Sequence, residues 1–283
     1  MVAINTNVSA TYSQNALTKN SRAMSTAMEQ LSTGTRVNSA RDDAAGLAIG
    51  QNMTSQIRGL NMAIRNLNDG INMMQTAEGA MIEQSNMLQR MRELAVQANN
   101  GTYSDTQRSY LSLEFEALSS QIGKIATETK WNDTCLLAGT SGTAAVSGTG
   151  TAAFTYQSGQ ASGQTISVTV TAMTLAGLGL GSVGGVSTAA SAAGSIALIG
   201  SALEKINLQR AAIGAGINQM EFAADNVTNI ASNTTQSRST IMDTDYALAT
   251  TQLAKTQIIQ QAATAMLAQA NQQPQQVMTL LKG

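Results

Sequence analysis

The segment MTSQIRGLNMAIRNLNDGINMM, residues 53–74, places apolar side chains at alternating intervals of four and three residues. Most of the residues between them are polar or small. This spacing predicts one apolar stripe along a long helix that packs lengthwise against other helices. The stripe consists of Met53, Ile57, Leu60, Ile64, Leu67, Ile71 and Met74.

A second stripe with the same spacing lies in the C-terminal half of the chain, and Arg210 is its one interruption. We therefore expect the two halves of the chain to pair through long helices. The second stripe consists of Ile196, Ile199, Leu203, Ile206, Ile213, Ile217, Met220, Ala224 and Val227.

The same periodicity predicts five helices in all. Gly34 suits the C-terminal cap of the first helix. Asn38 or Ser39 suits the N-terminal cap of the second helix, and Asp105 suits that of the third. The helices are expected at about 8–33, 43–99, from 105 through 125, 190–233 and 238–270.

Between the two stripes the composition changes, because residues 134–203 contain no Asp, Glu, Lys or Arg. Residues 165–171 alternate apolar and hydroxyl side chains, which predicts a strand, and residues 152–157 are its expected hairpin partner. A disordered linker is the alternative for this segment. The expected fold is mostly α, a long antiparallel helical bundle or coiled coil with paired terminal helices and a small β-hairpin region.

Composition excludes several classes of function. The chain has no His and one Cys, so the commonest general base and every Cys-cluster metal site are absent. We expect no enzyme activity, no metal and no cofactor. The net charge of −1 argues against binding to nucleic acid or an anionic membrane. We also expect no cleavable signal peptide and no membrane-spanning segment.

The first and last helices carry narrow apolar stripes, flanked mainly by Ala, Thr, Ser, Asn and Gln. Such ends are expected to order when copies of the chain assemble, since burying them removes few charges from water. An antiparallel pair folded within one chain is the alternative. The residues expected to mediate polymerisation are Leu17, Met24, Met28, Leu31, Met242, Tyr246, Leu253, Ile259 and Met266.

Several segments in both halves resemble bacterial flagellin, over about residues 1–138 and 190–283. They are Asn5-Thr6-Asn7, SARDDAAGLAI at 39–49, NDGI at 68–71, QRMRELAVQ at 89–97, Ala231-Ser232, DTDYA at 243–247, QANQ at 269–272 and Leu280-Leu281.

The resemblance implies a non-enzymatic subunit of the extracellular flagellar filament, exported unfolded by the flagellar type III apparatus. Its implied partners are further copies of itself, an export chaperone, and cap and hook-associated proteins. Residues 1–42 and 239–283 would form an inner core. Residues 43–238 would form a bundle domain with a β-rich insert at about 134–195, without outer domains. A hook–filament junction protein of the same superfamily is the alternative.

The resemblance also implies sites. Arg90, Leu94 and Glu114 match positions at which similar flagellins contact the host Toll-like receptor 5. Gln89, Arg92 and Glu93 adjoin them and are included in the expected receptor-binding set. Arg90 and Leu94 are expected to share a face apart from the apolar stripe. Arg41, Asp42 and Asp43 lie at the expected inter-domain joint. A helix cap is the simpler role for them, and a switch between supercoil states of the filament is the alternative. Whether Ser and Thr residues in 139–195 carry glycans, and whether Cys135 has any role, stays open.

Overall fold

The computed structural model describes residues 7–139, 150–181 and 184–282, with the side chains of 273–282 outside this description. The chain divides into two compact units, residues 58–231 and residues 1–57 with 232–283. Each unit is described by itself. The long helices α2 (Ala44–Ala98) and α5 (Ala189–Met242) contribute to both units.

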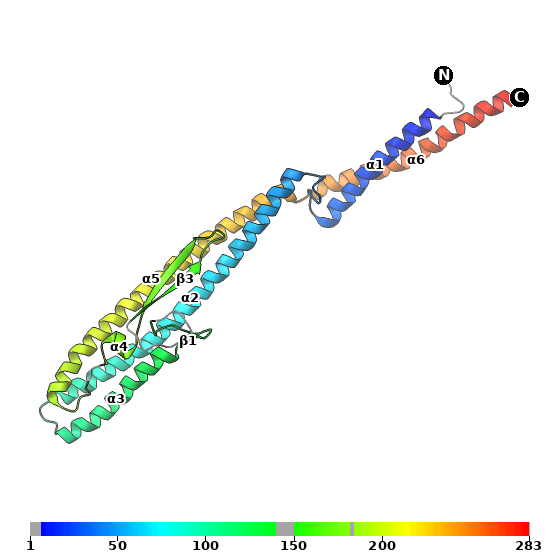
Figure 1. Cartoon of the computed structure of the whole chain (residues 1–283). Coiled ribbons are helices and arrows are strands. Elements are labelled where there is room, and N and C mark those ends of the chain that lie inside the picture. Colours follow the sequence, from blue (N-terminus) through cyan, green and yellow to red (C-terminus); the bar gives the residue numbers. More distant parts are fainter. Residues whose placement is uncertain (1–6, 140–149, 182–183, 283) are drawn as a thin grey trace. The chain divides into compact units, whose positions relative to one another are not determined.

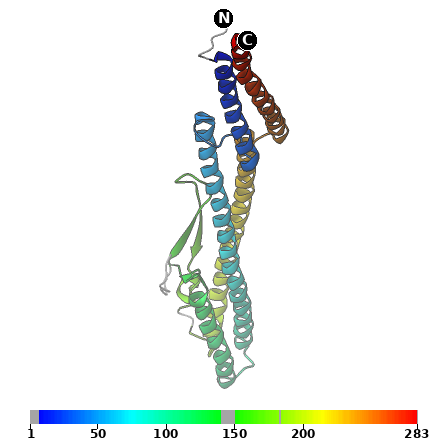
Figure 2. The same cartoon turned by 90° about the vertical axis from the view of Figure 1, so that its right-hand side faces the viewer.

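In the unit formed by residues 58–231, helices α2, α3 (Asp105–Glu128) and α5 lie side by side (Figure 1). The short connection after Ala98 reverses the chain, so α2 and α3 form an antiparallel hairpin (Figure 2). Members of both predicted stripes lie in the core of this bundle, together with further residues of α2, α3 and the β-rich segment. Its fully buried side chains include Leu67, Met74, Met81, Leu88, Met91, Phe115, Ile122, Ile199, Ile206, Ile213 and Met220.

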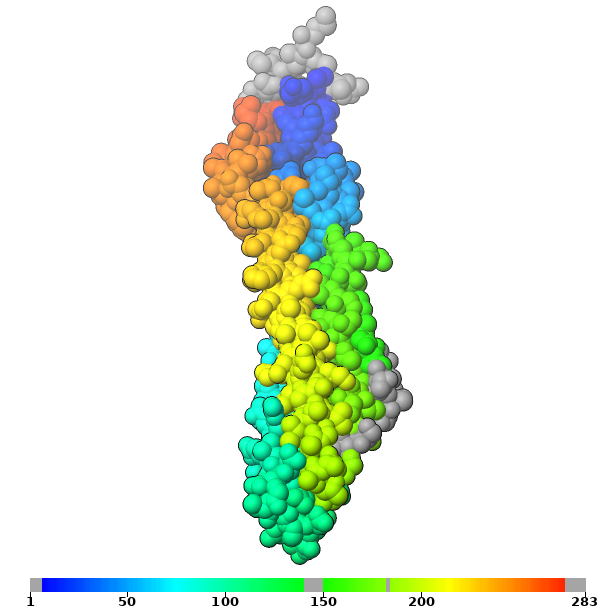
Figure 3. All heavy atoms as spheres, turned by 90° about the vertical axis from the view of Figure 1, so that its left-hand side faces the viewer, coloured from blue at the N-terminus to red at the C-terminus, as the bar shows by residue number. Residues whose placement is uncertain are grey.

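The predicted β-hairpin is confirmed. Strands β3 (Thr151–Gln157) and β4 (Thr165–Thr171) pair antiparallel, with Phe154 opposite Val168. The hairpin lies along α5 (Figure 3), and the apolar side chains of β4 point into the core. Gly216 of α5 permits this close approach, because a Cβ there would lie 2.8 Å from Val168.

Two glutamines fix the β-rich segment to the bundle through backbone groups. Gln209 of α5 accepts a hydrogen bond from the Thr171 amide (3.1 Å) and donates to the Thr169 carbonyl (2.9 Å). Gln84 of α2 donates to the carbonyls of Ile122 (3.2 Å) and Met173 (3.1 Å). Both glutamine side chains are buried, and these bonds give their amides partners except at Gln84 Oε1, which has none among the described residues.

In the other unit, α1 (Val8–Thr33) and α6 (Tyr246–Lys282) form an antiparallel pair. Asn20 donates to the carbonyl of Thr256 (2.7 Å), and Asn7 donates to that of Ala270 (2.8 Å). Small side chains close the contact, since Ala27 and Ala249 are buried. The structure therefore has the alternative arrangement for the terminal helices, a pair within one chain.

Several expected caps and boundaries were wrong, while the ends of α1 and its cap Gly34 were right. Asp43 caps α2 instead of Asn38 or Ser39, because its carboxylate accepts from the Gly46 amide (2.8 Å). Ser104 caps α3 in place of Asp105, through a capping box with Gln107.

The predicted break near residues 233–238 is absent, and α5 continues to Met242. The chain breaks at Asp243–Asp245 instead, where the Asp245 carboxylate accepts from the amides of Ala247 and Leu248. Two short elements were not expected. These are α4 (Leu175–Leu178) and the hairpin of β1 (Lys130–Trp131) and β2 (Thr134–Cys135).

Candidate functional site

The terminal helix pair exposes large apolar side chains on both of its helices. Met28, Tyr246, Ile259 and Met266 from the predicted polymerisation set are exposed, Met266 by 64%. The other members of that set, Leu17, Met24, Leu31, Met242 and Leu253, are half-buried.

Both helices expose further apolar residues, which lie beside the narrow stripes and are therefore not identified by the four–three spacing. Together with the four exposed residues above we call them the exposed apolar set. These further members are Val8 and Tyr12 of α1 and Leu248 and Ile258 of α6. From Ala247 to Asn271 the only charged residue is Lys255, so burial of this set would desolvate almost no charge.

The connection between α1 and α2 is tied to the connection between α5 and α6. The backbone of Arg36 donates to the carbonyl of Met242 (2.6 Å), and Thr244 donates to Gly34 (3.0 Å). The Arg36 guanidinium donates to the Ile241 carbonyl (2.7 Å) and lies 3.8 Å from Asp43. The sequence did not predict this role of Arg36, because no local pattern links it to residues about 200 positions away.

Of the three predicted joint residues, the structure gives Asp42 and Asp43 local roles and leaves Arg41 exposed. Asp42 accepts from the amide and hydroxyl of Ser39 at 3.0 and 2.9 Å. These hydrogen bonds, that of the hydroxyl foremost, hold the pKa of Asp42 below its ordinary value. Both carboxylates precede α2, which begins at Ala44.

On α2 and α3 an exposed charged cluster surrounds Arg90. Its guanidinium donates from Nε to Glu114 (2.9 Å) and from one terminal nitrogen to Glu93 (3.0 Å). These hydrogen bonds, first that to Glu114, raise the pKa of Arg90 and hold its side chain against α3. Gln89 and Arg92 are also exposed. We call these five residues the Arg90 surface.

Leu94 does not belong to the Arg90 surface, and the expectation that it shares the face of Arg90 was wrong. Its side chain is 1% exposed and packs in the core of the bundle. The apolar stripe of α2 is wider here than the four–three spacing alone implies, because α3 and α5 cover neighbouring faces of the helix.

Beside the Arg90 surface lies a shallow hollow of about 480 Å³ between α2 and α5. Val96 and Leu203 supply its apolar floor, and Arg92 and Glu93 supply charge at its rim. Gln89 and Gln97 complete the lining.

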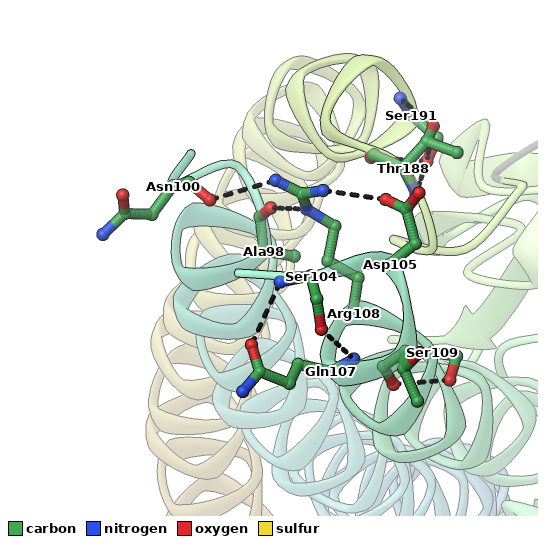
Figure 4. A network of polar contacts seen from close by, with 10 residues as sticks. Ala98, Asn100, Ser104, Asp105, Gln107, Arg108, Ser109, Thr188 and Ser191 are labelled. Carbon is green, nitrogen blue, oxygen red and sulfur yellow. Dashed lines mark hydrogen bonds and ion pairs between the residues drawn. The ribbon is translucent and has the colours of Figure 1, made fainter. Parts of the chain in front are cut away.

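At the connection between α2 and α3, Arg108 in the first turn of α3 donates hydrogen bonds to backbone carbonyls at the end of α2 (Figure 4). Its guanidinium donates to the carbonyls of Ala98 (2.8 Å) and Asn100 (3.1 Å) and pairs with Asp105 (2.9 Å). These carbonyls lack helical partners, so the arginine acts as a C-terminal cap.

Cys135 is buried and unbridged, with its thiol near the carbonyl of Thr127. The hydroxyls of Thr165, Ser167, Thr169 and Thr171 lie on the exposed face of β4, while residues 140–149 and 182–183 of the segment considered for glycans lie outside the described residues. Asn5 and Thr6 of the first flagellin-like motif do so as well.

Within the described ranges, no group of three or more His, Cys, Asp or Glu side chains lies close enough to hold a metal ion. No helix in this part of the chain has the length and apolarity that a membrane span requires.

The chain matches two regions of one protein family. Residues 4–142 match the bacterial flagellin N-terminal helical region, and residues 196–281 match the bacterial flagellin C-terminal helical region. Together these regions cover most of the chain.

Two relatives match along nearly their whole length. The chain is 39% identical to the flagellar filament 31.3 kDa core protein of Treponema maltophilum over 284 residues, or 99% of each chain. It is 38% identical to flagellin of Bacillus subtilis (strain 168) over 302 residues, again 99% of each. The crystal structure of Bacillus cereus flagellin superimposes with a TM-score of 0.50 at 30% identity, covering 60% of this chain and 94% of that one.

Proposed function

Because the chain belongs to the bacterial flagellin family and is a subunit of the flagellar filament, we propose that neighbouring copies cover its exposed apolar set as the filament grows. The protein is structural, has no enzymatic activity and acts outside the cell within the filament. The prediction of a filament subunit is confirmed, in preference to a hook–filament junction protein.

The observation that supports this proposal is the combination of exposed apolar side chains on α1 and α6 with the near absence of charge on α6. Tyr12, Leu248 and Ile258 are 79%, 71% and 66% exposed. Burial of one such side chain is worth roughly 1.5–3 kcal/mol, so a few of them per contact would hold subunits together. We assign residues 1–42 and 239–283 to the inner core of the filament and residues 43–238 to its bundle domain, with the insert at 134–195 and no outer domains.

Seeded growth tests this proposal. Ile258→Glu should slow elongation from filament fragments strongly, because a carboxylate would enter an apolar contact. Ile258→Val is the matched control and should elongate like the parent. Since Ile258 is exposed in the single chain, both variants should keep the helix content of the parent. Equal elongation by the Glu variant would remove Ile258 from the contact.

The remaining partners follow from family membership. Export in an unfolded state by the type III apparatus brings the chain into contact with an export chaperone before secretion and with cap and hook-associated proteins after it. The Gln-rich α6 would line the channel through which later subunits pass. Lys substitutions at several of its glutamines should then shorten filaments, and unchanged filament length would contradict this role.

We also assign host Toll-like receptor 5 to the Arg90 surface. The support is a preformed arrangement, because Glu93 and Glu114 hold the guanidinium of Arg90 in place while it stays half-exposed. The hollow formed with Val96 and Leu203 adjoins it. Leu94 would support receptor binding indirectly, because it packs in the core beneath the Arg90 surface and does not contact the receptor itself.

Receptor signalling by single-chain protein tests this assignment. Arg90→Ala should lower signalling, whereas Arg65→Ala, at an exposed arginine of the same helix that has no carboxylate partner among the recorded ion pairs of the described residues, should not. Parental signalling by the Arg90 variant would exclude Arg90 from the receptor contact.

A further inference from the structure

The connection between α2 and α3 contains Asn100-Gly101, and no other Asn in the sequence is followed by Gly. Both residues are exposed and follow the last helical residue of α2. A Cβ added to Gly101 would meet none of the described residues within 4 Å, so the space beside its Cα is open. We propose that this connection modifies itself, by conversion of Asn100 to an isoaspartyl residue in the folded protein.

The side chain of Asn100 is already turned toward the backbone that follows it. Its Oδ1 accepts a hydrogen bond from the Thr102 amide (3.2 Å). This turn sets the Asn100 Cγ opposite the nitrogen of Gly101, the residue between them. The Thr102 amide also draws electron density from Oδ1, which makes Cγ more electrophilic and stabilises negative charge that develops on the oxygen.

Arg108 acts on the other reactant, the peptide group between Asn100 and Gly101. Figure 4 shows its guanidinium directed at the Asn100 carbonyl, while the Asn100 side chain points away. The distance to that carbonyl oxygen is 3.1 Å. Loss of the Gly101 amide proton places negative charge on this same oxygen, and a cation there favours that loss.

The reaction balances without any co-reactant except water. The Gly101 amide gives up its proton to solvent, and its nitrogen forms a bond to the Asn100 Cγ. The Cγ–Nδ2 bond then breaks, and ammonia leaves, which closes a succinimide. Water adds to the former backbone carbonyl carbon, the one that Arg108 polarises, and the bond from that carbon to the Gly101 nitrogen breaks. The chain now runs through Cγ.

Arg108 would stabilise the isoaspartyl product at this position. The carbon that was the Asn100 carbonyl becomes a free carboxylate, and its oxygen is the atom that Arg108 contacts. The guanidinium therefore gains an ion pair, while the connection lengthens by one methylene. Water attack at Cγ would instead give ordinary aspartate, and Arg108 disfavours that outcome by polarising the other carbonyl. This inference does not depend on filament assembly or receptor binding.

The test follows isoaspartate in the full-length folded chain during incubation at neutral pH. Trypsin releases the peptide Glu93–Arg108, in which mass spectrometry locates the product, and isoaspartyl methyltransferase with labelled S-adenosylmethionine counts it. The same peptide, synthesised and incubated alone, gives the rate without structure. We expect the folded chain to form isoaspartate at least as fast as this peptide, with neighbouring Asn99 unchanged.

Two variants separate the parts of the proposal. Gly101→Ala should abolish the product without strain, since its added methyl meets open space. Arg108→Gln, in which the tryptic peptide extends from Glu93 to Lys124, should lower the rate to that of the free peptide or below. A folded chain that stays unmodified while the peptide converts overturns the proposal. An unchanged or faster rate in Arg108→Gln overturns the part assigned to the arginine.

Discussion

Single polar side chains join parts of this chain that are far apart in sequence. Asn20 reaches across 236 positions to the carbonyl of Thr256, and Gln84 across 89 positions to that of Met173. Each bond gives a partner to a buried side-chain amide, whose desolvation without one would cost about 1–3 kcal/mol. No local pattern identifies such residues, because Asn and Gln are equally common on the exposed faces of the same helices.

Tyr156 gives a prediction at the same scale. Burial against the bundle raises its pKa to about 12, and its hydroxyl contacts the sulfur of Met73 (3.3 Å). The neutral hydroxyl is therefore favoured in the folded state. The resulting stability is fully present below the ordinary pKa near 10 and is lost as the pH rises toward 12.

Tyr156→Phe should remove this dependence. Between about pH 8 and about pH 11 the parent should lose on the order of 1 kcal/mol of unfolding free energy relative to the variant, a figure discounted because solvent screens the half-buried group. Urea unfolding at both pH values measures the difference. Parallel pH profiles for parent and variant would mean that Tyr156 ionises as easily in the folded chain as in the unfolded one.

At the scale of elements, the sequence predicts the helices and strands that have a periodic apolar pattern, and it misses breaks that depend on a single capping residue. The long apolar stripes and the alternation at 165–171 identify α2, α5 and β4, because periodic burial leaves a periodic composition. The break between α5 and α6 was misplaced, since the same three–four spacing continues through Met242 and only the Asp245 cap marks the new helix.

The β1–β2 hairpin was missed for a similar reason. Asn132 and Asp133 adopt positive φ values of 46° and 63°, which a two-residue turn between strands requires. The strands beside them are only two residues long, so no alternation was visible in the sequence. The Asn-Asp pair was the one available signal.

The hairpin of β3 and β4 depends on Gln209, which gives a prediction for this element. Gln209→Leu keeps a side chain of similar size but leaves the Thr171 amide and the Thr169 carbonyl without their partner. The variant should lose about 1–3 kcal/mol of stability. Hydrogen exchange at the Thr171 amide should accelerate.

Gln219→Leu is the matched control, because Gln219 is exposed on the same helix. It should leave both stability and exchange at Thr171 unchanged. Equal behaviour of the two variants would show that α5 holds the hairpin by apolar packing alone.

At the scale of the whole molecule, the two units differ in how they bury their apolar side chains. Residues 58–231 bury a continuous core of their own. The terminal helices bury mainly small residues against each other and leave large apolar side chains exposed. Composition predicts part of this contrast, because α6 has almost no charged residues. Which of their residues face outward could not be predicted, since a narrow stripe fits either a partner helix or a second copy.

Methionine oxidation measures directly whether assembly covers the terminal helices. Met28 on α1 and Met266 on α6 are 56% and 64% exposed, whereas Met74, Met81 and Met91 are fully buried. Brief peroxide treatment of the free chain should oxidise the first two and spare the other three. In filaments grown from the same preparation, we expect Met28 and Met266 to become as resistant as the core methionines. Equal oxidation of these two residues in chain and filament would contradict the claim that subunits assemble through this face.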